Sequence, residues 1–141
     1  MIKRTKVLLL ILSAIFYSCH AQPPIWSKTR NWKIYALAGQ KIFTLPIDSI
    51  RALKNKSLDN NIMQFFLTKA AIIPKERTPV WMGAYLASYE TEDGNIRKVE
   101  VSAYGGFFYD ESSSLYFLLP HSIRDEWINY ISGSITLLKQ N

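Results

Sequence analysis

The residues of this 141-residue chain that could do chemistry are few, and most of them are carboxylates. Adjacent acidic residues occur three times, as Asp110–Glu111, Asp125–Glu126 and Glu92–Asp93. A glycosidase needs two carboxylates that face each other across about 5 to 10 Å, one of them with a raised pKa. Asp110 and Glu111 follow Phe107 and Tyr109, so this pair is the best candidate for burial in an active site. A polar turn between two strands explains the same pair without catalysis.

Histidine and cysteine add little to this set. His121 is one of two histidines, and Cys19 is the one cysteine. A zinc site needs three or four nitrogen, sulfur or carboxylate ligands, so we expect no metal and no cofactor. The sequence also contains no nucleophile elbow and no phosphate-binding glycine loop. We interpret His121 as a solvent-facing residue ahead of a helix, and we keep it beside Asp110 and Glu111 as a catalytic candidate for a hydrolase.

Aromatic side chains offer recognition instead of catalysis. Trp81, Tyr85, Tyr89 and Tyr104 are predicted to lie on one face of a β-hairpin. Such rings bury a large area while their polar atoms stay in water, and sugars and peptide side chains both bind to them. We therefore predict a binding face for an envelope protein, a peptide or a glycan. The alternative is that another element covers this face and the rings belong to the core.

The hairpin that positions these rings is predicted from its turn. Asp93-Gly94 is a strong signal for a two-residue loop between antiparallel strands. With that loop, Glu90 faces Arg97 across the hairpin, which pairs opposite charges. The tyrosines then lie on the face opposite an aliphatic set of residues, which we expect to be the core face.

Two adjacent glycines interrupt the aromatic residues near the end of this hairpin, in the run "YGGFF". In the predicted register, Gly106 lies opposite Trp81 and Tyr104 lies opposite Gly83, so each ring covers bare backbone. The glycines also allow the strand to bend before Phe107. This interpretation is structural and requires no catalytic role.

The remaining patterns predict a single α+β domain over residues 31–141. An antiparallel meander is expected over residues 80–119, with a helix after it. Asp59 and Ser122 are predicted helix N-caps, and Gly133 is predicted to end the C-terminal helix, with a strand or docked extension after it. The predicted N-terminal part has a hairpin of Trp32–Leu37 and Lys41–Leu45, a short helix from Asp48, and a helix from Asp59 that Pro74 closes.

The first 21 residues have the pattern of an export signal. Lys3, Arg4 and Lys6 precede the apolar run Val7–Tyr17, which is shorter than the roughly 20 residues a membrane-spanning helix needs. Cleavage before Cys19 would leave a cysteine for lipidation, whereas cleavage after Ala21 would remove it. We predict the lipidated form, followed by an extended leader over residues 22–30.

Charge and composition limit the class of partner. The net charge of the chain is +6, but three of its 17 basic residues lie in the signal, so the mature chain carries +3 in scattered positions. Nucleic-acid binding is therefore not expected. The order of basic end, apolar run and lone cysteine resembles small exported bacterial domains of the lipoprotein type. That resemblance implies a place on the periplasmic side of the cell envelope, held by a lipid anchor.

These observations lead to one leading hypothesis about function. We expect a non-enzymatic binding protein of the envelope, of which an immunity or inhibitor protein is one version. A small periplasmic hydrolase that uses a carboxylate pair is the alternative.

Overall fold

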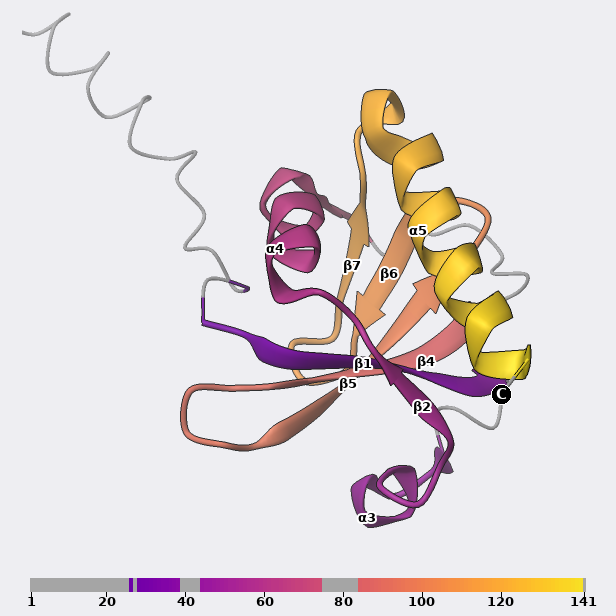
Figure 1. Ribbon diagram of the computed structural model, residues 1–141. Helices are drawn as coiled ribbons and strands as arrows, with labels where there is room; N and C mark the ends of the chain where they lie inside the picture. Colours follow the sequence, from indigo (N-terminus) through magenta and orange to yellow (C-terminus); the bar gives the residue numbers. More distant parts are fainter. Residues whose placement is uncertain (1–25, 27, 39–43, 75–83, 141) are drawn as a thin grey trace, which may run out of the picture.

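The computed structural model describes residues 26, 28–38, 44–74 and 84–140. Seven strands of this part form one antiparallel sheet, in the order β2-β1-β4-β5-β6-β7-β3 (Figure 1). The strands are β1 Arg30–Ala38, β2 Asn55–Ser57, β3 Ala71–Ile73, β4 Ala84–Glu90, β5 Ile96–Ser102, β6 Phe107–Asp110 and β7 Leu115–Leu118. The helices are α3 Ile47–Ile50, α4 Asn60–Lys69 and α5 His121–Gln140. The α+β class, the meander from β4 to β7 and the C-terminal helix are confirmed.

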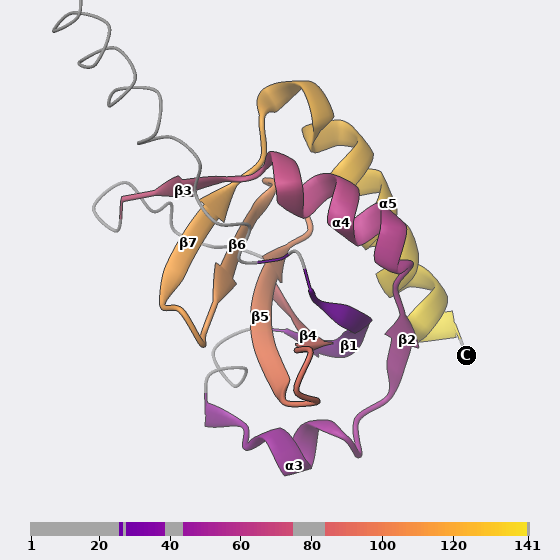
Figure 2. The same ribbon diagram turned by 90° about the vertical axis from the view of Figure 1, so that its left-hand side faces the viewer.

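The helices lie on opposite sides of the sheet. Helices α4 and α5 cover one face, and α3 lies on the other side (Figure 2). We call the face under α4 and α5 the inner face. Its core contains Trp32, Phe108 and Trp127, which are almost completely buried. The Nε1–H of Trp127 donates to the carbonyl of Ser102 at 3.1 Å, so its polar atom is satisfied in the core.

The opposite face, which we call the outer face, carries a smaller apolar cluster. Tyr35, Ile50 and Leu86 form this cluster where α3 lies against the sheet. Beside it the outer face is polar although it is buried, because Ser88, Lys98, Glu100 and Ser102 are at most 9% exposed. The sheet therefore has an apolar inner face and an outer face that buries polar side chains.

Helix α4 begins where the sequence predicts. Asp59 is its N-cap, and one carboxylate oxygen accepts hydrogen bonds from the amides of Asn61 and Ile62 at 2.8 and 3.0 Å. The predicted end at Pro74 is wrong, because the helix ends at Lys69 and the chain continues as β3. This strand pairs with β7 at the edge of the sheet, so tertiary pairing decides the conformation of these residues.

Helix α5 is longer than predicted. It continues through Gly133 to Gln140, where the sequence pattern predicts a stop and then a strand or an extension. The reason is burial on the inner face: Ile135 and Leu138 continue the buried stripe that begins with Ile123, Trp127 and Ile131. A glycine inside a helix costs about 1 kcal/mol, which the burial of two aliphatic side chains exceeds.

The β4–β5 hairpin is confirmed, but its predicted register is wrong by one residue. Glu90 pairs with Ile96 rather than with Arg97, because the loop has three residues, Glu92 to Gly94. The Gly94 amide donates to the Thr91 carbonyl at 3.0 Å, and Gly94 has a φ of +84°. A turn followed by one left-handed glycine is the usual form of a three-residue hairpin loop.

The glycine pair lies in a turn between β5 and β6, not inside one long strand. Gly106 has a φ of +67°, and a Cβ built on it would lie 3.0 Å from the Cγ of Arg124 in α5. Glycine is therefore required there both for the backbone angle and for the close approach of the helix. Trp81 and Gly83, the partners predicted for the two aromatic–glycine pairs, lie outside the described residues.

The predicted N-terminal hairpin falls partly outside the described residues, which do not include 41–43, and the described part of β1 pairs with other strands. Strand β1 pairs with β2 on one side and with β4 on the other. Leu45, the last residue of the predicted partner strand, lies outside any strand. The short helix predicted after Pro46 is α3, with Asp48 inside its first turn rather than at the N-cap.

Candidate functional site

The aromatic residues predicted to bind do not form one exposed surface in the described part of the chain. Tyr89 is 3% exposed and packs in the inner core against Trp26 and Trp32. Tyr85 is half-buried on the same face, with the ammonium of Lys139 5.5 Å from its ring centroid. Tyr104 is 69% exposed in the glycine turn. The prediction of an exposed aromatic face is corrected for Tyr89, which is a core residue, and Trp81 lies outside the described residues.

The candidate catalytic residues do not converge either. Asp110 is completely buried, and Glu111 is exposed and forms an ion pair with Lys98 at 2.8 Å. His121 is exposed at the first residue of α5. Within the described residues, no group of three or more His, Cys, Asp or Glu side chains could hold a metal ion.

Asp110 has a structural partner on the inner face. One carboxylate oxygen accepts from the hydroxyl of Tyr89 at 3.0 Å, and the other accepts from the hydroxyl of Ser112 and the amide of Ser113 at 2.8 and 2.9 Å. Burial raises the pKa of Tyr89 to about 12, a direction that the charge of Asp110 reinforces and the hydroxyl of Ser112 opposes. The phenol therefore stays protonated and donates to Asp110. This cluster joins β4 to the β6–β7 turn.

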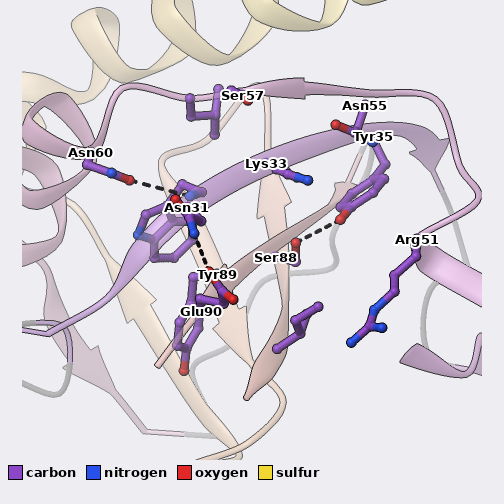
Figure 3. A pocket seen from close by; sticks show the side chains of 13 residues that line it. Asn31, Lys33, Tyr35, Arg51, Asn55, Ser57, Asn60, Ser88, Tyr89 and Glu90 are labelled. Atoms are coloured by element: carbon purple, nitrogen blue, oxygen red, sulfur yellow. Dashed lines mark hydrogen bonds between the residues drawn. The ribbon is translucent and has the colours of Figure 1, made fainter. Parts of the chain in front are cut away.

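A cavity of about 620 Å³ lies where β1 runs between β2 and β4 (Figure 3). We call it the β1 pocket. Most of the lining residues are polar, and they come from β1, from the strands β2 and β4 on either side of it, from the residue after α3 and from the start of α4. The lining residues are Asn31, Trp32, Lys33, Tyr35, Arg51, Asn55, Ser57, Leu58, Asn60, Ser88, Tyr89, Glu90 and Ile96.

Strand pairing brings these distant residues together. Lys33 pairs with Ser57 of β2 on one side and with Ser88 of β4 on the other. The β1–β4 register shifts between Arg30 and Lys33, and Asn31 in this shift has a φ of +51°. Asparagine tolerates this left-handed conformation better than most residues. The Asn31 amide nitrogen donates to the carboxylate of Glu90, which fixes the shifted segment at the rim (Figure 3).

Several polar groups of the β1 pocket are already satisfied within the protein. The hydroxyls of Tyr35 and Ser88 share a hydrogen bond of 2.8 Å. The side-chain oxygen of Asn60 accepts from the amide of Trp32 at 3.4 Å, and the side-chain nitrogen of Asn55 donates to the carbonyl of Leu53 at 3.0 Å. These bonds hold the walls in place without a ligand.

Two cations remain in the β1 pocket without an acidic partner. The side chains of Lys33 and Arg51 extend into the same space from β1 and from the end of α3 (Figure 3). In the described part of the chain, neither has a carboxylate oxygen within 4.0 Å. Glu90 is the one carboxylate in the lining, and Arg30 approaches it to 3.9 Å in addition to Asn31.

We compared this arrangement with known proteins. No family model, no curated protein and no solved structure matches the chain. The described helices also include none that is long and apolar enough to cross a bilayer.

The sequence pattern did not reveal the β1 pocket. Its basic residues stand among scattered lysines and arginines, and its asparagines and serines form no motif. These residues come together only through the pairing of β1 with both β2 and β4. No local sequence pattern predicts that pairing.

Proposed function

We propose that this chain is an exported, non-enzymatic binding protein of the cell envelope, and that the β1 pocket holds its ligand or a side chain of its partner. The observation that supports binding is a preformed cavity with hydrogen-bonded walls. A volume of about 620 Å³ lies in the range of small-molecule and cofactor sites, about 300 to 1,000 Å³. The sequence predicts recognition by an exposed aromatic face. Because Tyr89 of that face is buried in the core, we place recognition in the β1 pocket instead.

The hydrolase alternative has less support. A carboxylate couple requires two acids that face each other across a space open to substrate. Asp110 instead spends both oxygens on Tyr89, Ser112 and Ser113, and Glu111 faces Lys98. The β1 pocket contains one carboxylate, that of Glu90. An immunity or inhibitor protein remains one version of the binding hypothesis.

The proposed location rests on the N-terminal sequence. Cys19 follows the apolar run Val7–Tyr17 after one residue, where a lipid could be attached. We expect the native protein to begin at Cys19 and to carry lipid, which intact-mass analysis of the membrane fraction measures. An unmodified chain that begins at Gln22 would contradict the prediction of a lipid anchor, but it would still agree with the prediction of export.

The β1 pocket is tested by filling it. Ser57 is exposed on β2 at the pocket wall, so Ser57→Trp should occupy the space without entering either core. We expect the wild-type protein to capture a specific component from a detergent extract of the envelope, and Ser57→Trp to lose at least nine-tenths of it. The measurement is quantitative mass spectrometry of the captured material, beside a thermal melt of each variant.

Ser122→Trp is the matched control, because Ser122 is also exposed but lies on α5 and does not line the pocket. It should capture as much as the wild type does. Equal capture by Ser57→Trp and the wild type would show that the pocket is not the site. If the wild type enriches nothing above the level captured by an unrelated protein, the binding function itself is contradicted.

A further inference from the structure

We infer that the β1 pocket selects an oxyanion, a carboxylate or phosphate group carried by a molecule about as large as a sugar. This inference rests on the proposed binding function and names the chemistry of its ligand. Four features of the pocket support it: the charge of its lining, its unused hydrogen-bonding groups, the chemistry of its two cations and its size.

The charge that faces the cavity is positive. Lys33 of β1 and Arg51 after α3 contribute the cations, and the residues from β2, α4 and β5 in the lining are uncharged. The one opposing charge is Glu90 of β4, which accepts a hydrogen bond from the Asn31 side-chain nitrogen and has Arg30 3.9 Å away, so two cations face one carboxylate. Two positive charges in a partly enclosed cavity favour an anion more strongly than they would in open water, because the low-dielectric walls reduce screening.

The unused hydrogen-bonding groups include more donor hydrogens than acceptors, and the acceptors among them are the side-chain oxygens of Asn31 and Asn55 and one carboxylate oxygen of Glu90. The hydroxyls of Tyr35 and Ser88 share a hydrogen bond, and the side-chain nitrogen of Asn31 donates to Glu90. The Asn60 side-chain oxygen is occupied by the amide of Trp32, so what Asn60 can offer a ligand is chiefly its NH₂ group. Lys33, Arg51, Asn60 and the Ser57 hydroxyl together present donors to one space. A ligand with several acceptor oxygens on one group matches this set.

The two cations differ in a way that suits a carboxylate or phosphate. The guanidinium of arginine donates two parallel hydrogen bonds to such a group, whereas the lysine ammonium acts as a mobile point charge. Arg51 and Lys33 approach from different elements, so a ligand between them would be held from two sides. Chloride is a single atom, so it cannot accept the two parallel hydrogen bonds of the arginine guanidinium on two separate oxygens.

The cavity is larger than the anionic group alone. A volume of about 620 Å³ leaves room for a body of sugar size beyond the group that Lys33 and Arg51 would hold. Leu58 and Ile96 add apolar surface to the lining, while Asn55 and Ser57 add polar groups. The expected ligand is therefore a small organic oxyanion rather than a free inorganic ion.

The experiment is an NMR titration of the ¹⁵N-labelled protein with glucuronate, glucose 6-phosphate, glucose and inorganic phosphate, at constant ionic strength. We expect the backbone amides of Lys33, Ser57 and Ser88 to shift and to saturate with at least one of the two charged sugars. Glucose should bind at least tenfold more weakly, and inorganic phosphate should bind more weakly than the better sugar acid. The double variant Lys33→Met/Arg51→Met should lose the charged-sugar response by at least tenfold, whereas Lys54→Met, outside the lining, should keep it.

The outcomes separate this inference from the proposed function. Saturation with neither charged sugar, or equal binding of glucose, would overturn the oxyanion inference. The capture assay tests the same inference with the components of the envelope extract instead of selected sugars. If Ser57→Trp loses the envelope component but Lys33→Met/Arg51→Met keeps it at full strength, the pocket binds its ligand and the oxyanion inference is wrong. If Ser57→Trp also captures the envelope component at full strength, the proposed function of the pocket is contradicted, whatever the charge of the ligand.

Discussion

Asp110→Ala is expected to lower the free energy of unfolding by about 2 to 4 kcal/mol, because the change leaves buried donors without their acceptor. Asp110 is completely buried, and it accepts hydrogen bonds from Tyr89, Ser112 and the amide of Ser113. The Ser113 amide has no other acceptor in the described part of the chain. Equilibrium unfolding in urea at pH 7 measures the loss.

Two variants show whether the hydrogen bonds account for this loss. Asp110→Asn keeps one oxygen acceptor and should cost about half as much as the alanine variant. Asp125→Ala, at an exposed position of α5, should change stability by at most about 0.5 kcal/mol. Replacement of a catalytic acid often leaves a fold as stable as before or more stable. An Asp110→Ala protein as stable as the wild type would therefore contradict the structural role and restore Asp110 as a catalytic candidate.

Local patterns predicted the elements whose signals lie within a few residues. Asp59 precedes an apolar helical pattern, and it caps α4 through two backbone amides. The alternation of residues around Asp93-Gly94 predicts a hairpin, which β4 and β5 form. The class of the fold follows, because an antiparallel meander with a helix after it needs no long-range information beyond these neighbours.

A difference of one residue in register changes the predicted face of Tyr85 and Tyr89. Asp93-Gly94 would form a two-residue loop if both residues took positive φ, but Gly94 does so and Asp93 does not. The third loop residue moves the pairing by one, and a shift of one exchanges the two faces of a strand. Tyr85 and Tyr89 therefore lie on the inner face with Val99 and Val101, not opposite them.

The β1 pocket depends on contacts that sequence patterns do not contain. Strand β2 has three residues, and neither its length nor its composition marks it as a strand. It pairs with β1 residues that are 20 to 24 positions away in the chain, which places Ser57 opposite Lys33 and Asn55 opposite Tyr35. Long-range pairing of this kind is decided by how the whole sheet and its helices pack.

The outer face of the sheet also buries an acid that the sequence pattern did not single out. Glu100 of β5 is 8% exposed, between Leu86 of β4 and Tyr109 of β6 in the register. Burial raises the pKa of Glu100 from 4.5 to about 7. In the described part of the chain, no cation forms an ion pair with this carboxyl, since the ion pairs there join Lys28 to Glu92, Arg30 to Glu90 and Lys98 to Glu111. A buried carboxylate without such support is costly, so the protonated form is favoured.

The folded protein should consequently lose stability as the pH rises. Between pH 4.5 and about 7, the folded state holds a proton on Glu100 that the unfolded state has released. The contribution of Glu100 is therefore most favourable below pH 4.5, falls through this window and is fully lost above pH 7. A shift from 4.5 to about 7 corresponds to a penalty of up to about 3 kcal/mol at high pH.

Glu100→Gln should remove this penalty, because glutamine has nearly the same shape and no charge. At pH 8 we expect the variant to unfold with a free energy about 1 to 3 kcal/mol higher than the wild type, and at pH 4.5 we expect the two to differ by less than about 1 kcal/mol. Urea unfolding at several values of pH between 4.5 and 8 measures both curves.

Glu126→Gln, at an exposed position of α5, controls for the loss of one negative charge and should leave the pH dependence unchanged. If Glu100→Gln is less stable than the wild type at pH 8, the ionised carboxylate must have a favourable partner in the folded protein, and the expected cost of its burial would be contradicted.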